Sequence, residues 1–246
     1  EIYSLQTELR SIEEEVDDLQ NSTGANNAGA AARTVIGQGY RQYLTGIRVG
    51  GDRILILLDA STSMLHRSIV NAIRLGLMAP EEKLAAEKWQ RAVRTVEWVS
   101  ANVPPDADVR LVAFRGEPTP LSEWISATSE PDTEAMLERL RTHVPDGGSS
   151  LINVFDYVAD MEPPPDNIFL ITDGLPTQGR NEPRAPTVSS SERVKLFRNA
   201  IGTLEDNIPV NVVLFPMEGD PMATPYYWIL AQETSGSFLA PSRDWP

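Results

Sequence analysis

The residues best suited to chemistry are an aspartate and two serines at alternate positions. Asp59, Ser61 and Ser63 directly follow the apolar run 54–58, which reads ILILL. An unbroken aliphatic run is typical of a central strand in a parallel sheet, covered by helices on both faces. Open α/β sheets bind their ligands just past the carboxyl ends of such strands. A carboxylate and two hydroxyls at that point indicate a hard cation, with phosphate chemistry as the competing interpretation.

Two further loops offer oxygen atoms and neither nitrogen nor sulfur ligands. The segment 147–150 reads GGSS and precedes a predicted helix, and Asp173-Gly174 follows the apolar run 168–171. We expect these loops and 59–63 to meet at one rim of the sheet, where they supply two carboxylates and several hydroxyls. Oxygen-only ligation selects Mg²⁺, Mn²⁺ or Ca²⁺. Because most of the direct ligands are neutral, the ion could still accept a carboxylate from a partner.

The elements that would position these loops alternate between strand and helix. Strands are predicted over 53–59, 108–114, 168–172, 210–215 and 237–240, with an edge strand at 121–127 and a candidate leading element at 40–49. Helices are predicted over 81–103, 151–161, 190–204 and 226–233, and from a cap at Asp132 to His143. This alternation predicts an α/β fold: a doubly wound, mostly parallel six-stranded sheet with helices on both faces.

Residues 1–20 form a separate acidic segment. Apolar residues recur there at spacings of three and four, at Ile2, Leu5, Leu9, Ile12, Val16 and Leu19. The segment holds seven acids and one base, so a basic or mixed partner helix suits it better than a second copy. A helix lying on its own domain is the alternative, since short isolated helices are marginal in water. Residues 21–33 read as a polar linker, and the main domain is predicted over 34–246.

The composition excludes several classes of function. The formal net charge is −14 and no basic stripe is present, which argues against binding to nucleic acid or to anionic lipid. The chain has no cysteine and two histidines, so disulfides, thiolate catalysis and a multi-histidine metal site are not expected. No apolar run approaches the length of a membrane span. The chain begins at Glu1 rather than methionine, which is compatible with a signal or anchor upstream.

The three loops resemble those of the von Willebrand factor A domain family. The D-x-S-x-S pattern at Asp59, Ser61 and Ser63 is similar to the first loop of that family's metal-ion-dependent adhesion site. The second loop of the family usually reads Gly-Gly-Thr-Asn and corresponds to 147–150, and Thr172-Asp173-Gly174 corresponds to its third loop. The resemblance extends from about residue 51 to residue 240. It includes the segment 231–238, which is similar to the closing helix-turn-strand of the family.

The resemblance implies a role for each ligand. Ser61, Ser63 and Ser149 would give hydroxyl oxygens to a divalent cation, Mg²⁺ or else Mn²⁺ or Ca²⁺. Asp59 and Asp173 would bind directly or through water and would orient the serines. The implied function is protein binding, in which an acidic side chain of the partner completes the coordination. Ser149 replaces the usual threonine, which keeps the hydroxyl but loses the methyl group that restricts the rotamer.

The connection after the first loop departs from the family pattern. The segment 66–80 is longer than usual, and its apolar residues, Ile69 and Leu77 among them, are spaced as on a short amphipathic helix. It should lie beside the metal, so we expect His66, Arg67, Ile69 and Leu77 to contact the partner. The alternative is an extra helix that packs on the core.

Two other classes of function remain open. A structural or assembly protein could act through the helix at 1–20 while the metal site is idle. A magnesium-dependent phosphatase of the haloacid dehalogenase type also carries an aspartate after its first strand, but it needs a second acid where Ser61 stands. No other nucleophile or nucleotide motif is present, and we expect no enzyme. The short first loop is more similar to bacterial members of the family, for which a cell-envelope location with an anchor upstream of Glu1 is expected.

Overall fold

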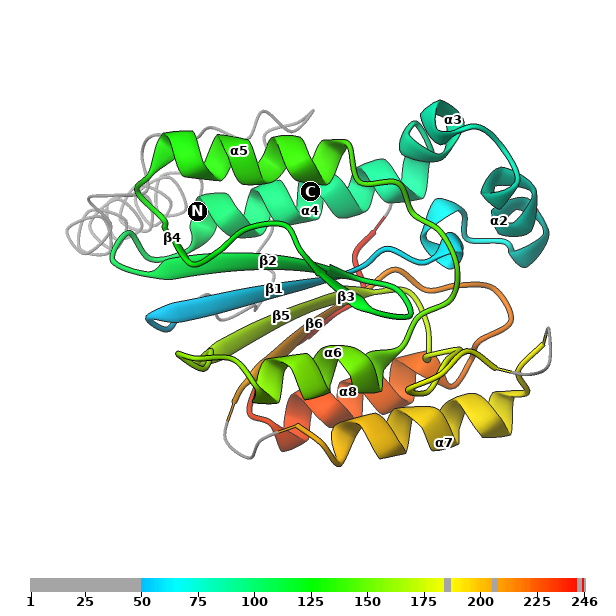
Figure 1. Ribbon diagram of the computed structural model, residues 1–246. Coiled ribbons are helices and arrows are strands. Elements are labelled where there is room, and N and C mark those ends of the chain that lie inside the picture. The colour runs from blue at the N-terminus through cyan, green and yellow to red at the C-terminus, as the bar shows by residue number, and fades with distance from the viewer. Residues whose placement is uncertain (1–49, 184–186, 205–207, 243–244, 246) are drawn as a thin grey trace, which may run out of the picture. The chain divides into compact units, whose positions relative to one another are not determined.

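The computed structural model describes residues 50–183, 187–204, 208–242 and 245, and Figure 1 shows their arrangement. The chain divides into two units, Glu1–Thr34 and Val35–Pro246. The predicted helix at 1–20, the linker at 21–33 and the leading element at 40–49 lie outside the described residues. All elements below belong to the second unit.

The described residues form one mostly parallel sheet that confirms the predicted fold class. Along the sheet the strands are β3 (Pro118–Pro120), β2 (Asp108–Phe114), β1 (Arg53–Asp59), β5 (Asn167–Thr172), β6 (Val210–Leu214) and β7 (Phe238–Leu239), with β4 (Ile125–Ser126) also on β2. Strands β1, β2, β5, β6 and β7 are parallel, and only β3 and β4 run antiparallel to β2. Strand β1 therefore occupies the centre, as its continuous apolar run predicts.

The edge of the sheet differs from the sequence prediction. A single strand over 121–127 is wrong: two short strands, β3 and β4, give the described sheet seven strands instead of six. The amides of Leu121 and Ser122 both donate to the carbonyl of Leu111, at 2.8 and 3.3 Å, so the chain bulges between β3 and β4. The Ser122 hydroxyl accepts the Leu111 amide at 3.0 Å and fixes this bulge.

Helices cover both faces of the sheet, as Figure 1 shows. The first turn after β1 is η2 (Thr62–Leu65), followed by α2 (Ile69–Gly76), α3 (Pro80–Leu84), α4 (Glu87–Asn102), α5 (Glu130–Arg141), α6 (Leu151–Ala159), α7 (Ser190–Ile201) and α8 (Ala223–Glu233). Helices α4 and α5 lie on one face, and α6, α7 and α8 lie on the other. Among the described residues, no helix combines the length and the apolar character needed to cross a membrane.

Two hydrophobic cores explain the apolar run of β1. Ile54, Ile56 and Leu58 pack into the core shared with α4 and α5, whereas Leu55 and Leu57 pack into the core shared with α6, α7 and α8. All five side chains are fully buried. Because alternate residues of a strand point to opposite faces, a strand covered on both sides needs apolar residues at every position.

Two predicted helix boundaries are wrong. The single helix over 81–103 is divided into α3 and α4 at Ala86, whose backbone is extended, and the Gln90 side chain caps the carbonyl of Leu84 at 2.7 Å. Helix α5 begins after Ser129 rather than after a cap at Asp132. The Ser129 hydroxyl instead donates to the Asp132 carboxylate in the first turn, at 2.5 Å.

Candidate metal centre

Three loops meet at the rim formed by the carboxyl ends of the central strands. Strands β1 and β5 are parallel neighbours in the register Leu58 to Ile171, so Asp59 and Asp173 both leave the sheet at the same end. The second loop, 147–150, joins the first through backbone hydrogen bonds. The Thr62 amide donates to the Gly147 carbonyl at 2.9 Å, and the amide of residue 146 donates to the carbonyl of residue 60 at 2.9 Å.

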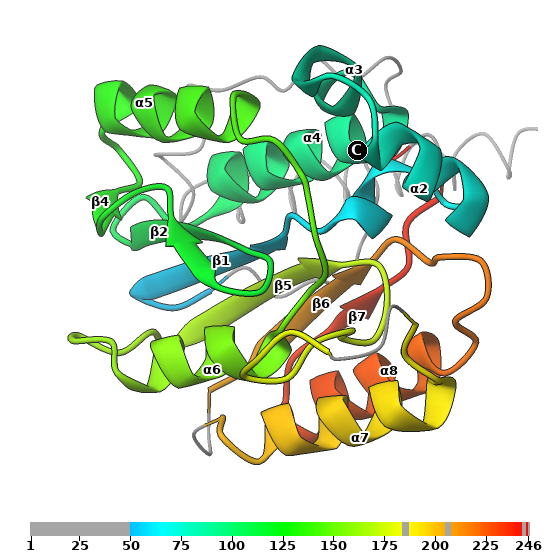
Figure 2. The same cartoon turned by 45° about the vertical axis from the view of Figure 1, so that its right-hand side comes forward.

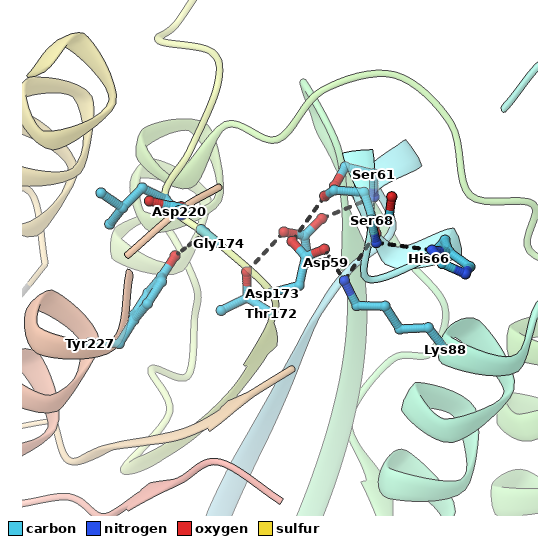
Figure 3. Close-up of polar contacts among 12 residues, drawn as sticks. Asp59, Ser61, His66, Ser68, Lys88, Thr172, Asp173, Gly174, Asp220 and Tyr227 are labelled. Carbon is cyan, nitrogen blue, oxygen red and sulfur yellow. Dashed lines mark hydrogen bonds and ion pairs between the residues drawn. The ribbon is translucent and has the colours of Figure 1, made fainter. Parts of the chain in front are cut away.

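Four of the five predicted ligands form one hydrogen-bonded chain, shown in part in Figure 3. The Ser63 hydroxyl donates to Asp173 Oδ1 at 2.9 Å, and the oxygens of Ser61 and Ser63 lie 2.9 Å apart. Because the single hydroxyl proton of Ser63 is directed at Asp173, Ser61 is the donor in that pair. Asp59 Oδ1 accepts the Ser61 amide at 2.9 Å and so fixes the backbone of the first loop.

Two glycines and the chain after β5 hold the second loop in place. Gly147 has φ +67°, a conformation that favours glycine. A Cβ atom on Gly148 would lie 2.6 Å from the Thr177 hydroxyl, so a side chain there would push the two loops apart. The Ser149 amide donates to that hydroxyl at 3.1 Å, and the Ser149 carbonyl accepts the amides of Thr177 and Gln178 at 3.0 and 2.9 Å.

The two serines of the second loop have different surroundings. Ser150 caps α6 by accepting the Asn153 amide at 3.3 Å, and it donates to the Gly179 carbonyl at 2.7 Å. The hydroxyl of Ser149 makes no hydrogen bond within the described part of the chain, although the residue is only 5% exposed. The fold does not use this oxygen, and three hydrogen bonds hold the backbone of Ser149, so the oxygen is suited to a ligand. The structure thus favours Ser149 over Ser150 as the oxygen donor of this loop.

Asp59 is a buried carboxylate with an unfavourable charge. It is 1% exposed, and its Oδ2 atom accepts the Thr172 hydroxyl at 2.9 Å. Burial raises the pKa of Asp59 from its ordinary 3.8 to about 6, and the negative charge of Asp173 adds to the shift. A cation placed between these loops would relieve both effects.

A lysine that the sequence analysis missed also belongs to the site. Lys88, in the first turn of α4, places its Nζ atom 2.5 Å from Asp173 Oδ2 and 3.0 Å from the Ser63 carbonyl (Figure 3). Lys88 lies on the buried face of α4 with Ala92 and Thr95, at i+4 and i+7. Lysine is rarely buried, so a lysine on the buried face of a predicted helix is the sequence signal that could have identified Lys88.

A second group of buried polar side chains supports the third loop, 172–174, from behind. Asp220 accepts the Leu175 amide at 2.7 Å and forms an ion pair with Arg193 at 2.8 Å. The Tyr227 hydroxyl donates to the Gly174 carbonyl at 3.0 Å, and burial raises the pKa of that hydroxyl. These contacts fix the backbone on which Asp173 stands.

The donor set of the rim fits a hard divalent cation. Asp59 and Asp173 bring two negative charges and Lys88 brings one positive charge, which leaves an excess of one negative charge among buried groups. The available ligand atoms are carboxylate and hydroxyl oxygens, the ligands that Mg²⁺, Mn²⁺ and Ca²⁺ prefer. Within the described ranges, no three or more His, Cys, Asp or Glu side chains cluster. A cation here would therefore depend on hydroxyls, and its coordination would be incomplete.

Helix α2 lies beside the first loop in both views of the molecule (Figures 1 and 2). Several of its apolar side chains are exposed. Ala72 is the buried residue of this helix, and Leu75 packs partly buried against the core. Packing on the core therefore does not explain the exposed Ile69, Val70 and Ile73. Five neighbouring side chains, which we name the α2 patch, are exposed by 46, 75, 59, 85 and 39%: Ile69, Val70, Ile73, Leu77 and Met78.

The predicted contact residues His66 and Arg67 border a pocket next to this helix. Its volume is about 410 Å³, and its lining residues are His66, Arg67, Glu87, Lys88, Arg91, Phe215, Pro216 and Pro241. His66 Nδ1 accepts the Ser68 amide at 2.9 Å, whereas the Arg67 side chain is exposed. The pocket therefore brings the cationic side chains of Arg67, Lys88 and Arg91, together with the carboxylate of Glu87, to one place beside the rim.

Comparison with known protein families identifies the class of the protein. The von Willebrand factor type A domain family matches residues 3–74 and 100–193, which is more than half of the chain. The chain therefore belongs to this family, whose fold is often used in protein–protein interaction or adhesion. The unmatched segment between these ranges contains α3 and Lys88.

Solved structures are similar to this chain at low sequence identity, and the first one below shows the same fold. A von Willebrand factor type A protein from Catenulispora acidiphila has a TM-score of 0.51 and 13% identity, over 79% of this chain and 39% of that chain. An aerotolerance-related membrane protein from Bacteroides fragilis has a TM-score of 0.45 and 16% identity, over 79% and 93%. The PilB minor pilin from Streptococcus sanguinis has a TM-score of 0.49 and 16% identity, over 80% and 57%. The chain spans about two fifths of the C. acidiphila protein. No curated protein matches the chain.

Proposed function

We propose that this domain binds a partner protein through a divalent cation, Mg²⁺ or else Mn²⁺ or Ca²⁺, at an adhesion site of the von Willebrand type. The ligands are the carboxylates and hydroxyls of Asp59, Ser61, Ser63, Ser149 and Asp173. The observation that carries the proposal is the convergence of three loops on one rim with only oxygen donors and an excess of negative charge. The short first loop is the reason to include in the proposal that the chain is of the bacterial type.

Four of the five ligands are positioned by hydrogen bonds among themselves. Ser61 and Ser63 are held 2.9 Å apart with lone pairs that remain free to bind a cation. Asp59 orients the first loop through the Ser61 amide, and Asp173 orients the Ser63 hydroxyl. The bound cation supplies a positive centre with an open coordination position, which can accept a carboxylate oxygen of the partner.

The surroundings of the rim define the chemistry of the partner. The α2 patch offers exposed aliphatic side chains, and Arg67 offers an exposed positive charge. We infer that the partner presents an Asp or Glu side chain flanked by apolar residues, with His66, Arg67, Ile69 and Leu77 in the interface. A chain of net charge −14 repels acidic proteins, so the cation is what allows an acidic side chain to approach.

Binding without catalysis is part of the proposal. The position two residues after Asp59 is Ser61, which donates a hydrogen bond to Ser63 and cannot act as a general acid in the way a carboxyl group does. Turnover of a generic phosphate ester with Mg²⁺ would contradict this view.

Calorimetry with Mg²⁺ and Mn²⁺ tests the metal site. Ser61→Ala should abolish measurable binding, because it removes one hydroxyl ligand and breaks the hydrogen-bonded chain. Ser189→Ala is the matched control. It also removes a serine hydroxyl, but that hydroxyl caps α7 by accepting the Glu192 amide and belongs to none of the three loops. Equal affinity of the wild type and Ser61→Ala would remove Ser61 from the site.

Capture of the partner tests the binding surface. Proteins retained by the wild type should be lost with a chelator and with Ser61→Ala. Leu77→Ser should weaken capture without changing the metal affinity, because Leu77 is 85% exposed and lies in the α2 patch. Deleting residues 1–33 separates this function from one carried by the N-terminal segment: capture that survives the deletion and stays chelator-sensitive supports the metal face.

A further inference from the structure

A buried ammonium group lies inside the candidate metal centre. Lys88 Nζ contacts Asp173 Oδ2 at 2.5 Å and the Ser63 carbonyl at 3.0 Å. The side chains of Lys88 and Asp173 are 8% and 2% exposed, so little solvent screens the pair. One of the two carboxylates that a cation needs is thus already neutralised by the protein.

The Lys88 pair differs from the other pairs near the rim. Lys83 pairs with Asp146 at 3.2 Å, but the Asp146 side chain is 56% exposed and its charge is screened by water. Asp220 and Arg193 form a buried pair at 2.8 Å, but that pair is already balanced and supports the third loop from behind. A buried ion pair contributes little to stability relative to apolar residues, so stability alone does not account for Lys88.

The charge balance indicates what Lys88 does. Asp59, Asp173 and Lys88 together carry one negative charge, so a divalent cation would leave the centre with one positive charge. A single carboxylate from outside would make the centre neutral. In a buried site, where charges interact strongly, this difference favours the state with both the cation and the external carboxylate.

We propose that Lys88 is a tethered cation that weakens the binding of free divalent ions and makes tight binding depend on the carboxylate of a partner. This inference rests on the proposed function. The consequence is specificity for acidic partners. The centre would bind a divalent ion weakly in the absence of a partner and tightly when a Glu or Asp side chain of the partner is present. Binding of the metal and binding of the acidic group would then reinforce each other.

Calorimetry on the full chain tests this role with four proteins: the wild type, Lys88→Met, Lys88→Gln and Lys83→Met. Lys88→Met and Lys88→Gln should bind Mn²⁺ about tenfold more tightly than the wild type, because each removes the competing charge. Lys88→Gln also retains a donor for the Ser63 carbonyl, which protects against misfolding. Lys83→Met is the matched control, because it removes a lysine from the neighbouring helix that does not contact Asp173.

Acetate serves as the probe for the external carboxylate. Replacing chloride with acetate at constant ionic strength should raise the Mn²⁺ affinity of the wild type by a larger factor than that of Lys88→Met. Circular dichroism and thermal unfolding establish that each variant is folded. An acetate effect of the same size in both proteins would overturn the dependence on a partner carboxylate.

The outcomes separate this inference from the proposed function. Equal Mn²⁺ affinity of the wild type and both Lys88 variants would overturn the inference and leave the proposed function standing. An equally large increase in Mn²⁺ affinity in Lys83→Met would also overturn the inference, because removing any nearby positive charge would then have the same effect. Mn²⁺ binding to the Lys88 variants, with none to the wild type even in acetate, would support the weakening effect of Lys88 and overturn the proposed function. No binding to any folded protein would overturn both.

Discussion

Both ends of the parallel sheet bury polar side chains. Only at the amino end are these side chains neutral and hydrogen-bonded to one another. At the amino end, Asn211 Nδ2 donates to Asn167 Oδ1 at 2.6 Å, and Asn167 Nδ2 donates to the Gly50 carbonyl. Asn211 Oδ1 accepts the Ser237 amide at 3.0 Å and the Ser237 hydroxyl. These groups are neutral and use one another as hydrogen-bond partners. The cluster therefore links neighbouring strands and does not suggest a ligand site.

At the carboxyl end, the buried groups are charged and incompletely satisfied. Lys88 pairs with Asp173 and leaves the Asp59 carboxylate without a cationic partner among the described residues. Burial raises the pKa of Asp59 to about 6, and the Ser149 hydroxyl has no hydrogen bond in the same part of the chain. At both ends, hydrogen bonds to the backbone hold the side chains in position. The comparison teaches that buried polarity alone does not mark a binding site. In the proposed function, an excess of one charge on groups whose positions are fixed is what distinguishes the carboxyl end.

The largest effect is expected from breaking the charged end. Asp173→Ala should lower the free energy of unfolding by about 3–5 kcal/mol, because it leaves the Lys88 ammonium buried without its counter-charge. Adding Lys88→Met to that variant should restore most of the loss, since an apolar side chain can replace the uncompensated charge. Urea unfolding of the two variants measures both values.

The double variant also separates stability from metal binding. It should fold and yet fail to bind Mg²⁺ or Mn²⁺ in calorimetry, because the Asp173 carboxylate is gone. If Asp173→Ala were as stable as the wild type, the Lys88 ammonium would have to reach water in solution. The contrast between the two ends of the sheet would then be smaller than the structure shows.

A second effect should appear in the pH dependence of stability. The pKa of Asp59 is about 6 in the folded chain and near its ordinary 3.8 in the unfolded chain, so folding takes up a proton between these values. The stabilisation from the protonated carboxyl is therefore present at low pH and is lost as pH rises through about 6. The metal-free protein should lose about 3 kcal/mol between pH 4 and pH 7 from this group alone.

Asp59→Asn provides the control for this titration. Asparagine keeps one oxygen for the Ser61 amide and places its other polar group against the Thr172 hydroxyl, which can accept as well as donate. Urea unfolding across pH, with a chelator present, should show a flatter profile for this variant than for the wild type. Parallel profiles would mean that Asp59 titrates normally in the folded chain.

A third and smaller effect is expected at the neutral end. Asn211→Ala should lower the free energy of unfolding by about 1–3 kcal/mol, because it removes the acceptor of the Ser237 amide in a buried position. The affinity for Mg²⁺ should be unchanged, because the substitution lies at the opposite end of the strands. A change in metal affinity without further loss of stability would show that the two ends are coupled.

Much of the fold could be predicted from the sequence, because long apolar runs and helical stripes carry strong signals. The run 54–58 predicted a central strand, and β1 is buried on both faces. The misses fall where local hydrogen bonds decide the structure. Ser122 creates the bulge between β3 and β4, and the Gln90 side chain helps to separate α3 from α4. Side-chain contacts of this kind leave no periodic pattern in a sequence.

The site was only partly predictable, for a similar reason. The spacing of Asp59, Ser61 and Ser63 and the position of Asp173 follow from the ends of strands, and the structure brings these residues together. Lys88 lies in a different helix and reaches the rim only through the packing of α4 on the sheet. A sequence alone gives no distance between Lys88 and Asp173, so the charge balance of the site required the structure.

The smallest effect on stability, and the most specific, is expected from the second loop. Ser149→Ala should change the free energy of unfolding by no more than about 0.5 kcal/mol, because the hydroxyl has no hydrogen bond to lose. It should still weaken Mn²⁺ binding, because it removes one of three hydroxyl ligands.

The adjacent Ser150→Ala should behave in the opposite way. It should cost about 1–2 kcal/mol by removing the cap of α6, with little effect on the metal. Urea unfolding and calorimetry on this pair compare neighbouring serines that differ only in whether the fold already uses their hydroxyl. If both variants lost stability and kept their affinity, the Ser149 oxygen would belong to the fold, and the rim would have to hold its cation with the first and third loops alone.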